Sequence, residues 1–312
     1  IQPFRADHPR FVDILSRNAA PDPRIVETVS KIVDDVRTHG DEALFRYMKT
    51  FDHADLSQTG PRVPDSEIDA ALHAMTPAYR DALEAACENI RRYHEHQRPA
   101  DYAVEGPDGE ILERRHWPIA SVGVCVPGAS APLSSSLYMN LVPAKVAGVP
   151  RPVVISAPRG GHVDPHILAV AAHLGVREIY AISGAQGVAA LAYGTESVPR
   201  VDKIVGPGNI WVMTAKRLVY GAVGVDSLAG PSEIVVIADE TANPRYIAID
   251  LLSQAEHGTG LEAAVAFVTS QAQAESIRDE IAALCQRSDL TETVKPALDR
   301  YGTIFVVDDP DI

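Results

Sequence analysis

The residues best suited to chemistry lie at the end of one helical stretch and in a set of glycine-rich turns. The stretch ends in Ser253-Gln254-Ala255-Glu256-His257, where a spacing of three places Gln254 and His257 on one helical face. An imidazole nitrogen and an amide oxygen there could share a metal ion, although zinc usually takes four ligands. The competing interpretation is a polar helix end with His257 at the negative pole of the helix dipole, and spacing alone favours it.

Four turns of glycine, proline and small residues each follow or flank an apolar run, at 126–130, 183–187, 206–209 and 230–233. Ligands of open parallel sheets bind beyond the carboxyl ends of the strands, where helix N-termini offer free N–H groups to anions. One such turn alone is better interpreted as a simple chain reversal, but four in succession weaken that interpretation. The dinucleotide fingerprint G-x-G-x-x-G is absent, so the residues themselves indicate only a nucleotide-like ligand.

Other reactive side chains are better explained as packed or solvated groups. Cys125 lies in an apolar run without a basic neighbour, which favours a packed thiol over a nucleophile. His94 and His96 point to different sides of a helix, and His162 and His166 lie in a polar segment, so all four are expected on the surface. The three cysteines show no CxxC spacing, so neither a disulfide framework nor a cysteine zinc site is predicted.

The elements that position these residues follow from periodicity. The expected strands are 121–126, 152–156, 178–183, 203–205, 233–238, 263–269 and 303–307. The expected helices between them are 137–147, 164–174, 185–192, 210–219, 244–257 and 271–285. The first hundred residues are mostly helical, with a break at His39-Gly40-Asp41 and a second helical stretch over 65–96. Strands that alternate with helices predict βαβ units on a parallel sheet.

The predicted fold class is α/β, with two Rossmann-like globules that contain parallel sheets and follow an N-terminal helical region. We expect residues 1–117 to form that helical region and lead into the first globule. Residues 118–228 would form the second globule, on the cofactor side, and residues 229–312 would return to the first globule, on the substrate and metal side. No internal repeat supports this duplication independently.

Composition narrows the class of protein. The formal net charge of -14 opposes binding to a nucleic-acid backbone. Hydrophobic residues make up 46% and charged residues 22%, as in globular proteins, and no apolar run approaches the roughly 18 residues that span a bilayer. The first ten residues lack a signal-peptide pattern, and a start at Ile1 suggests a trimmed chain. We expect a cytoplasmic protein with reduced cysteines.

The run from Ser183 to His257 resembles the histidinol dehydrogenase family at nearly every position, most clearly in GPGNI, AGPSE and LLSQAEH. The similarity extends to VGVCVPGASAPLSSSLYMNLVPAKVAGV and, more faintly, to the N-terminal helices. The resemblance implies a cytoplasmic homodimer that oxidises L-histidinol through L-histidinal to L-histidine, as a step of histidine biosynthesis. It also implies two NAD+ used in succession, and one zinc ion that holds the substrate's amino and imidazole nitrogens.

Carried over position by position, the resemblance assigns roles to seven residues. Those that would touch NAD are Cys125, Pro127, Gln186 and Asn209. Those that would touch the substrate are Ser232, Gln254 and His257, of which Gln254 and His257 would also ligate zinc. Two positions depart from the family pattern, which usually has a tyrosine at Cys125 and a second glycine at Ala129, so cofactor packing could differ.

The resemblance further implies that the acid/base Glu-His pair, and an Asp and a partner-subunit His that complete the zinc shell, follow Ile312. The sequence has two Glu-His pairs: Glu256-His257 already belongs to the metal motif, and the other, Glu95-His96, lies in the helical stretch over 65–96. Loss of a general base typically costs about 10²- to 10⁴-fold in rate. We therefore expect the 312 residues to bind zinc poorly and to turn over little.

Two alternatives stay open. One is a paralogous NAD-dependent dehydrogenase for another small polyol or amino alcohol, which Cys125 and Ala129 make plausible. The other is a non-catalytic member of the family that binds a nucleotide.

Overall fold

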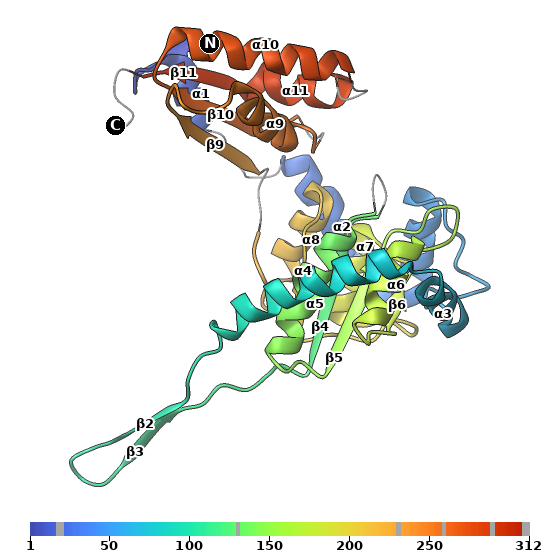
Figure 1. Ribbon diagram of the computed structural model, residues 1–312. Helices are drawn as coiled ribbons and strands as arrows, with labels where there is room; N and C mark the ends of the chain where they lie inside the picture. The colour runs from blue at the N-terminus through green and yellow to red at the C-terminus, as the bar shows by residue number, and fades with distance from the viewer. Residues whose placement is uncertain (17–21, 129–131, 229–231, 258–259, 288–290, 308–312) are drawn as a thin grey trace. The chain divides into compact units, whose positions relative to one another are not determined.

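The structure is a computed structural model that describes residues 1–16, 22–128, 132–228, 232–257, 260–287 and 291–307. The chain forms two compact units (Figure 1). The larger unit is Pro21–Leu228, and the smaller unit combines Ile1–Ala20 with Ala229–Ile312. This division departs from the expected boundary at residue 118, because the N-terminal helices from residue 23 onward pack in the larger unit.

A five-stranded parallel sheet forms the centre of the larger unit. Its strands are β4 (Ser121–Val126), β5 (Arg151–Ser156), β6 (Ile179–Tyr180), β7 (Lys203–Val205) and β8 (Gly224–Val225). Their order is β6-β5-β4-β7-β8, so the chain begins at β4, builds outward to β6, and then crosses to the other side of β4. In such doubly wound sheets, ligands bind at the carboxyl edge where the direction of building reverses. Here that point lies between β4 and β7.

Helices cover both faces of this sheet. One face carries α3 (Asp65–His73), α4 (Pro77–Glu95), α5 (Ser134–Val146) and α6 (Pro165–His173). The other carries α2 (Pro23–Phe51), α7 (Gly184–Tyr193) and α8 (Ile210–Val219). Side chains of β4 alternate between the two cores, with Val124 in the first and Cys125 in the second. Because both faces are covered, every residue of β4 is buried, as is usual for a central parallel strand.

The break expected at His39-Gly40-Asp41 is present as a kink in α2. Gly40 leaves the helical conformation and has a φ of +54°. A residue with a Cβ would adopt this positive φ only at a cost. The helix restarts at Asp41, whose backbone N–H donates to Glu196 Oε2 over 2.7 Å. In return, the Asp41 carboxylate accepts from the Ser197 hydroxyl over 2.8 Å, so α2 is fastened to the loop after α7.

The smaller unit has its own parallel sheet, in the order β1-β11-β10-β9. Its strands are β1 (Gln2–Pro3), β9 (Glu233–Ala238), β10 (Ala263–Val268) and β11 (Thr303–Val306). Its helices are α1 (Pro9–Leu15), α9 (Pro244–Ala255), α10 (Gln271–Arg287) and α11 (Thr291–Tyr301). Phe4 and Phe11 from the N-terminal segment pack on Phe267 and Phe305 of β10 and β11. This aromatic cluster explains why the start of the chain belongs to the smaller unit.

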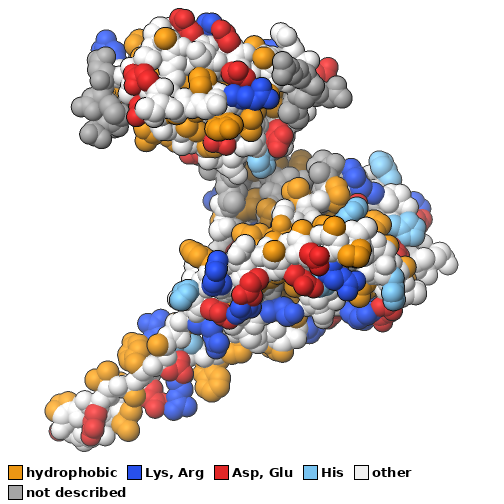
Figure 2. Space-filling model, viewed as in Figure 1, with side chains coloured by type: hydrophobic (Ala, Val, Ile, Leu, Met, Phe, Trp, Pro, Cys, Tyr) orange, Lys and Arg blue, Asp and Glu red, His pale blue; other side chains and the backbone are white. Residues whose placement is uncertain are grey.

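An antiparallel hairpin of β2 (Tyr102–Glu105) and β3 (Ile111–Arg114) extends from the larger unit (Figure 1). Every residue of both strands is exposed, including Tyr102, Val104, Ile111 and Leu112. Figure 2 shows apolar side chains along this arm. The sequence patterns did not predict the hairpin, because none of its residues reports a buried face.

Several predicted elements are shorter in the structure, including one strand and one helix of the candidate sites. The strand expected over 178–183 is confined to Ile179–Tyr180, and the helix expected over 244–257 ends at Ala255. Among the helices in the described part of the chain, none combines the length and apolar character needed to cross a membrane.

Candidate functional site

The point between β4 and β7 is built from two turns that follow neighbouring strands. Pro127 and Gly128 follow β4, and Gly206-Pro207-Gly208-Asn209 follows β7. Gly206 has a φ of +102°, and a Cβ at this position would clash with the carbonyl oxygen of Cys125. The second turn therefore passes directly over the end of β4, and only glycine fits there. The structure thus brings the strand end at Cys125 and the turn before Asn209 together.

An ion pair between a buried lysine and a partly exposed aspartate holds this turn in place. Lys216 of α8 is only 1% exposed, and its Nζ donates to the Gly206 carbonyl over 3.0 Å and to Asp226 Oδ1. Asp226 Oδ2 accepts from the Gly206 N–H over 2.8 Å. Both polar groups of Gly206 are therefore held by one charged pair, whose hydrogen bonds offset the cost of burying the ammonium group. Sequence analysis missed both residues, since nothing local indicates that this lysine is buried.

Asn209 presents only one end of its amide group to a ligand. It is the N-cap of α8, and its Oδ1 accepts from the backbone N–H groups of Trp211 and Val212, each over 3.1 Å. The carbonyl end is therefore used within the protein. The exposed side chain leaves its NH2 group as the donor that could meet a bound molecule.

Gln186 lies in the first turn of α7 and is tied to the end of α2. Its Nε2 donates to Asp52 Oδ2 over 3.1 Å and lies 3.5 Å from the Met48 sulfur. Ser183 Oγ donates to the other carboxylate oxygen of Asp52 over 2.8 Å. Burial is the largest influence on Asp52 and raises the pKa of its carboxyl group, although these hydrogen bonds lower it. Sequence analysis missed Asp52, because its partners are more than a hundred residues away.

Cys125 contributes its backbone rather than its thiol to this edge. Its side chain lies in the core between the sheet and helices α2, α7 and α8. Burial raises the pKa of the thiol to about 12, so the expected packed, unreactive cysteine is found. Residues 129–131, which continue the turn after Pro127 and include Ala129, lie outside the described residues.

In the smaller unit, the three residues expected to touch substrate reach the same edge of the sheet. Ser232 directly precedes β9, and its carbonyl accepts from the N–H of Ala263 at the start of β10 over 3.3 Å. Helix α9 runs back from the carboxyl end of β9, so Gln254 and His257 also lie at the amino edge. Gly230 and Pro231 of the same motif lie outside the described residues.

His257 lies just beyond α9, and its ring turns back on the helix. Its Nδ1 lies 3.0 Å from the backbone carbonyl oxygen of Gln254. This contact fits an Nδ1–H donor and leaves Nε2 for a ligand. Metal-binding histidines are commonly oriented in this way. Gln254 Nε2 is buried without a hydrogen-bond partner in the described chain. These donors suit zinc in kind but not in number, because the described residues contain no cluster of three or more His, Cys, Asp or Glu that could hold a metal.

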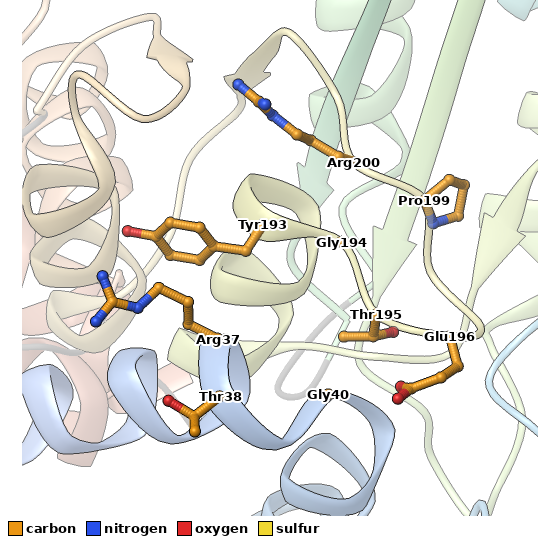
Figure 3. Close-up of a pocket in the computed structure, with 9 residues that line it drawn as sticks. All are labelled: Arg37, Thr38, Gly40, Tyr193, Gly194, Thr195, Glu196, Pro199 and Arg200. Carbon is orange, nitrogen blue, oxygen red and sulfur yellow. The ribbon is translucent and has the colours of Figure 1, made fainter.

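A hollow of about 570 Å³ lies at the opposite, amino edge of the larger unit's sheet (Figure 3). It is lined by Arg37, Thr38, Gly40, Tyr193, Gly194, Thr195, Glu196, Pro199 and Arg200. None of these is a predicted site residue. The Arg37 guanidinium lies 5.8 Å from the centre of the Tyr193 ring, and Glu196 holds the kink of α2. We interpret this hollow as the junction between α2 and α7.

The remaining histidine predictions agree with the structure. His96, His162 and His166 are exposed and His94 is partly exposed. The rings of His94 and His166 also pack edge-on against Tyr93 and Tyr79.

Comparison with known proteins gives consistent similarities. The sequence model of the family described as histidinol dehydrogenase matches residues 15–311. The histidinol dehydrogenase of Listeria innocua is 45% identical over 283 residues, which cover 91% of this chain and 66% of the relative. That of Symbiobacterium thermophilum is 43% identical over 303 residues, which cover 96% and 68%. The crystal structure of histidinol dehydrogenase from Elizabethkingia anophelis superposes with a TM-score of 0.87 at 33% identity, covering 96% of this chain and 68% of that one. The chain thus spans about two thirds of the length of these relatives.

Proposed function

Because the chain belongs to the histidinol dehydrogenase family, we propose that it takes part in the NAD-dependent oxidation of L-histidinol, through L-histidinal, to L-histidine. The observation that carries this proposal is the edge between β4 and β7. There a glycine turn fixed by the Lys216–Asp226 ion pair leads into the N-terminus of α8. Such an edge accepts the pyrophosphate and ribose groups of a dinucleotide.

The larger unit would bind NAD. Asn209 offers a donor and Gln186 offers an amide, each at the start of a helix. The backbone of Cys125 lies against the Gly206 turn, and Pro127 follows the end of the same strand. The positive end of the α8 dipole favours an anionic group beside Asn209.

The smaller unit would bind the substrate. Ser232, Gln254 and His257 share one edge of its sheet, and Gln254 and His257 would hold the zinc ion through an amide oxygen and an imidazole nitrogen. When bound, zinc supplies a template that fixes the nitrogens of the amino alcohol. The Nδ1 contact to the Gln254 carbonyl fixes the ring of His257 and keeps its Nε2 turned away from its own helix.

The proposal includes a cytoplasmic homodimer whose ligands are small molecules. A net charge of -14 gives no support for a nucleic-acid partner.

Calorimetric titration of the 312-residue chain tests the proposal. We expect NAD+ to bind, since all four predicted cofactor residues lie in the larger unit, and L-histidinol to bind in the presence of zinc in preference to simple diols. Absence of NAD+ binding would overturn the dinucleotide site.

The relative affinities for L-histidinol and simple diols test the second candidate function, a paralogous dehydrogenase for another polyol or amino alcohol. That candidate is favoured by Cys125, whose small side chain is turned into the core at a position where the family usually has tyrosine. Equal or tighter binding of a simple diol would replace L-histidinol by that substrate class.

A further inference from the structure

Gln186 has a fixed side-chain orientation that follows from its neighbours. The residue is 2% exposed, and its amide lies against Gly184, where an added Cβ would come within 2.6 Å of Oε1. The amide therefore occupies space that any other residue at position 184 would fill. Its Nε2 faces the Asp52 carboxylate over 3.1 Å.

The carboxylate decides which end of the amide faces outward. An ionised carboxylate only accepts hydrogen bonds, so the NH2 end of Gln186 must face Asp52. The reverse orientation would place the amide oxygen against a carboxylate oxygen. Ser183 Oγ donates to the second oxygen of Asp52 and so holds the carboxylate in this position.

The opposite end of the amide is free to meet a ligand. Gln186 Oε1 accepts no hydrogen bond from the described residues. It is also not one of the described side-chain atoms that are wholly buried without a partner. The group that Gln186 offers at the carboxyl edge is therefore a carbonyl oxygen.

We propose that Asp52 is a positioning residue that fixes Gln186 as a hydrogen-bond acceptor, so that the cofactor group recognised there is a hydroxyl, amide or amino donor and not a phosphate. This inference rests on the proposed function, in which Gln186 touches NAD. A phosphate at this place would meet an acceptor oxygen backed by a negative carboxylate, and both disfavour an anion. The anionic part of the dinucleotide then belongs at the other turn, where Asn209 offers NH2 at a helix N-terminus.

The test compares NAD+ affinities measured by calorimetry. Gln186→Ala removes the acceptor, and we expect affinity to fall about tenfold, as for one hydrogen bond. Asp52→Asn should also lower affinity, but by less, because the introduced amide can face Gln186 with either its oxygen or its NH2 group and so no longer fixes which end of Gln186 faces outward. The double variant Asp52→Asn with Gln186→Glu keeps the net charge. The amide at position 52 can donate to one oxygen of the carboxylate at position 186, whose other oxygen then faces the ligand as an acceptor. We expect it to recover most of the lost affinity.

Asp55→Asn is the matched control, since Asp55 lies three residues away and pairs with Lys49 and Ser57 instead. It should leave NAD+ affinity unchanged. If Gln186→Ala binds NAD+ like the unsubstituted chain, the proposed cofactor site itself fails. If Gln186→Ala weakens binding but Asp52→Asn does not, only the positioning role fails. If the double variant recovers nothing, Asp52 has a structural role and the acceptor assignment is overturned.

A pH titration of the unsubstituted chain keeps the proposal testable if Asp52→Asn does not fold. Protonation gives Asp52 an O–H donor, so that it no longer acts only as an acceptor toward Gln186, and burial raises the pKa of this carboxyl group above its usual 3.8. The groups that face it are Ser183 and Gln186, which are neutral, and His53, which adds positive charge. NAD+ affinity should therefore fall as the pH drops through that raised pKa, and His53→Gln should retain the fall. A flat profile would overturn the proposal.

Discussion

Asn209 and Gln186 carry the same amide group but present opposite ends of it. The side-chain oxygen of Asn209 accepts hydrogen bonds from the first turn of α8, whereas the NH2 group of Gln186 donates to Asp52. A spacing rule or a family pattern can name both residues. Their hydrogen-bonding polarity follows only from the groups that each already contacts.

Asn209→Asp separates the capping role of this residue from its binding role. Aspartate caps a helix about as well as asparagine, so the free energy of unfolding should change by less than about 0.5 kcal/mol. The donor is lost and a negative charge replaces it, so NAD+ affinity should fall at least tenfold. Denaturant unfolding and calorimetry measure the two effects. Asn243→Asp, at the equivalent cap of α9, is the control and should change neither.

Lys216→Met tests the ion pair between Lys216 and Asp226 that holds the Gly206 turn. Methionine fills similar space but leaves the Asp226 carboxylate and the Gly206 carbonyl without their cation. Breaking a fully buried pair from one side costs about 3 kcal/mol, but the Asp226 side chain is 30% exposed, so the loss should lie between that value and the cost at an exposed pair. Lys216→Met with Asp226→Asn should recover part of it. Urea unfolding gives the values. The exposed pair Lys31–Glu27 supplies the control, since Lys31→Met should cost under about 1 kcal/mol; equal losses at both lysines would contradict the role given to Lys216.

Gly206 and Gly221 share nearly the same backbone angle and differ in what surrounds them. Their φ values are +102° and +99°, but a Cβ at Gly221 would meet nothing within 4 Å, whereas one at Gly206 would meet the Cys125 carbonyl. Gly221→Ala should therefore cost only backbone strain, about 1–2 kcal/mol. Gly206→Ala should cost clearly more and should also weaken NAD+ binding. Similar losses in thermal unfolding would show that the close approach to β4 contributes nothing.

At the scale of elements, the hairpin of β2 and β3 has no packing partner among the described residues, because every residue of both strands is exposed. An isolated two-stranded hairpin is marginally stable in water, and this one exposes apolar residues on both faces. Val104 and Leu112 are cross-strand partners and so share one face. In the proposed homodimer, a second copy of the chain would cover that face.

The variant Val104→Glu with Leu112→Glu tests this surface. Two buried charges at a contact between copies oppose association, so sedimentation velocity should show a shift from dimer to monomer at equal concentration. Leu15→Glu is the control, because Leu15 of α1 is similarly exposed but lies in the smaller unit. A dimer that survives the double substitution would place the interface elsewhere.

The strands and helices of both sheets show where sequence periodicity is informative. The apolar runs predict β4, β7 and β9 to the residue. For β4 the reason is burial on both faces of the sheet, whereas β9 is an edge strand whose Val235 and Ile237 are exposed. The hairpin has no buried face to report. Strand β6 is shorter than its apolar run, since Ala181 and Ile182 are buried without pairing in the sheet.

At the scale of the whole molecule, long-range pairing decides what sequence analysis could not. The N-terminal segment joins the smaller unit because β1 pairs with β11, about three hundred residues later, and no local pattern reports such a contact. The same holds in the site, where Gln186, Asn209, Gln254 and His257 were identified by resemblance. Asp52 orients Gln186 in the first turn of α7, and Lys216 holds the Gly206 turn before α8. Both roles depend on contacts in the folded structure that no local sequence pattern indicates.

The composition of the metal motif leads to a prediction for the 312 residues as a polypeptide. Gln254 and His257 supply two zinc ligands, and Glu256-His257 is part of the same motif. The other Glu-His pair, Glu95-His96, is exposed at the end of α4, so we expect neither pair to serve as acid/base. After dialysis the polypeptide should retain far less than one zinc per chain, and its NADH formation with L-histidinol should lie about 10²- to 10⁴-fold below that of a complete enzyme. NAD+ binding should persist, because the predicted cofactor residues belong to the larger unit. Histidinol dehydrogenase of Listeria innocua, assayed in parallel, is the reference; stoichiometric zinc together with comparable turnover would show that these two ligands and this pair suffice.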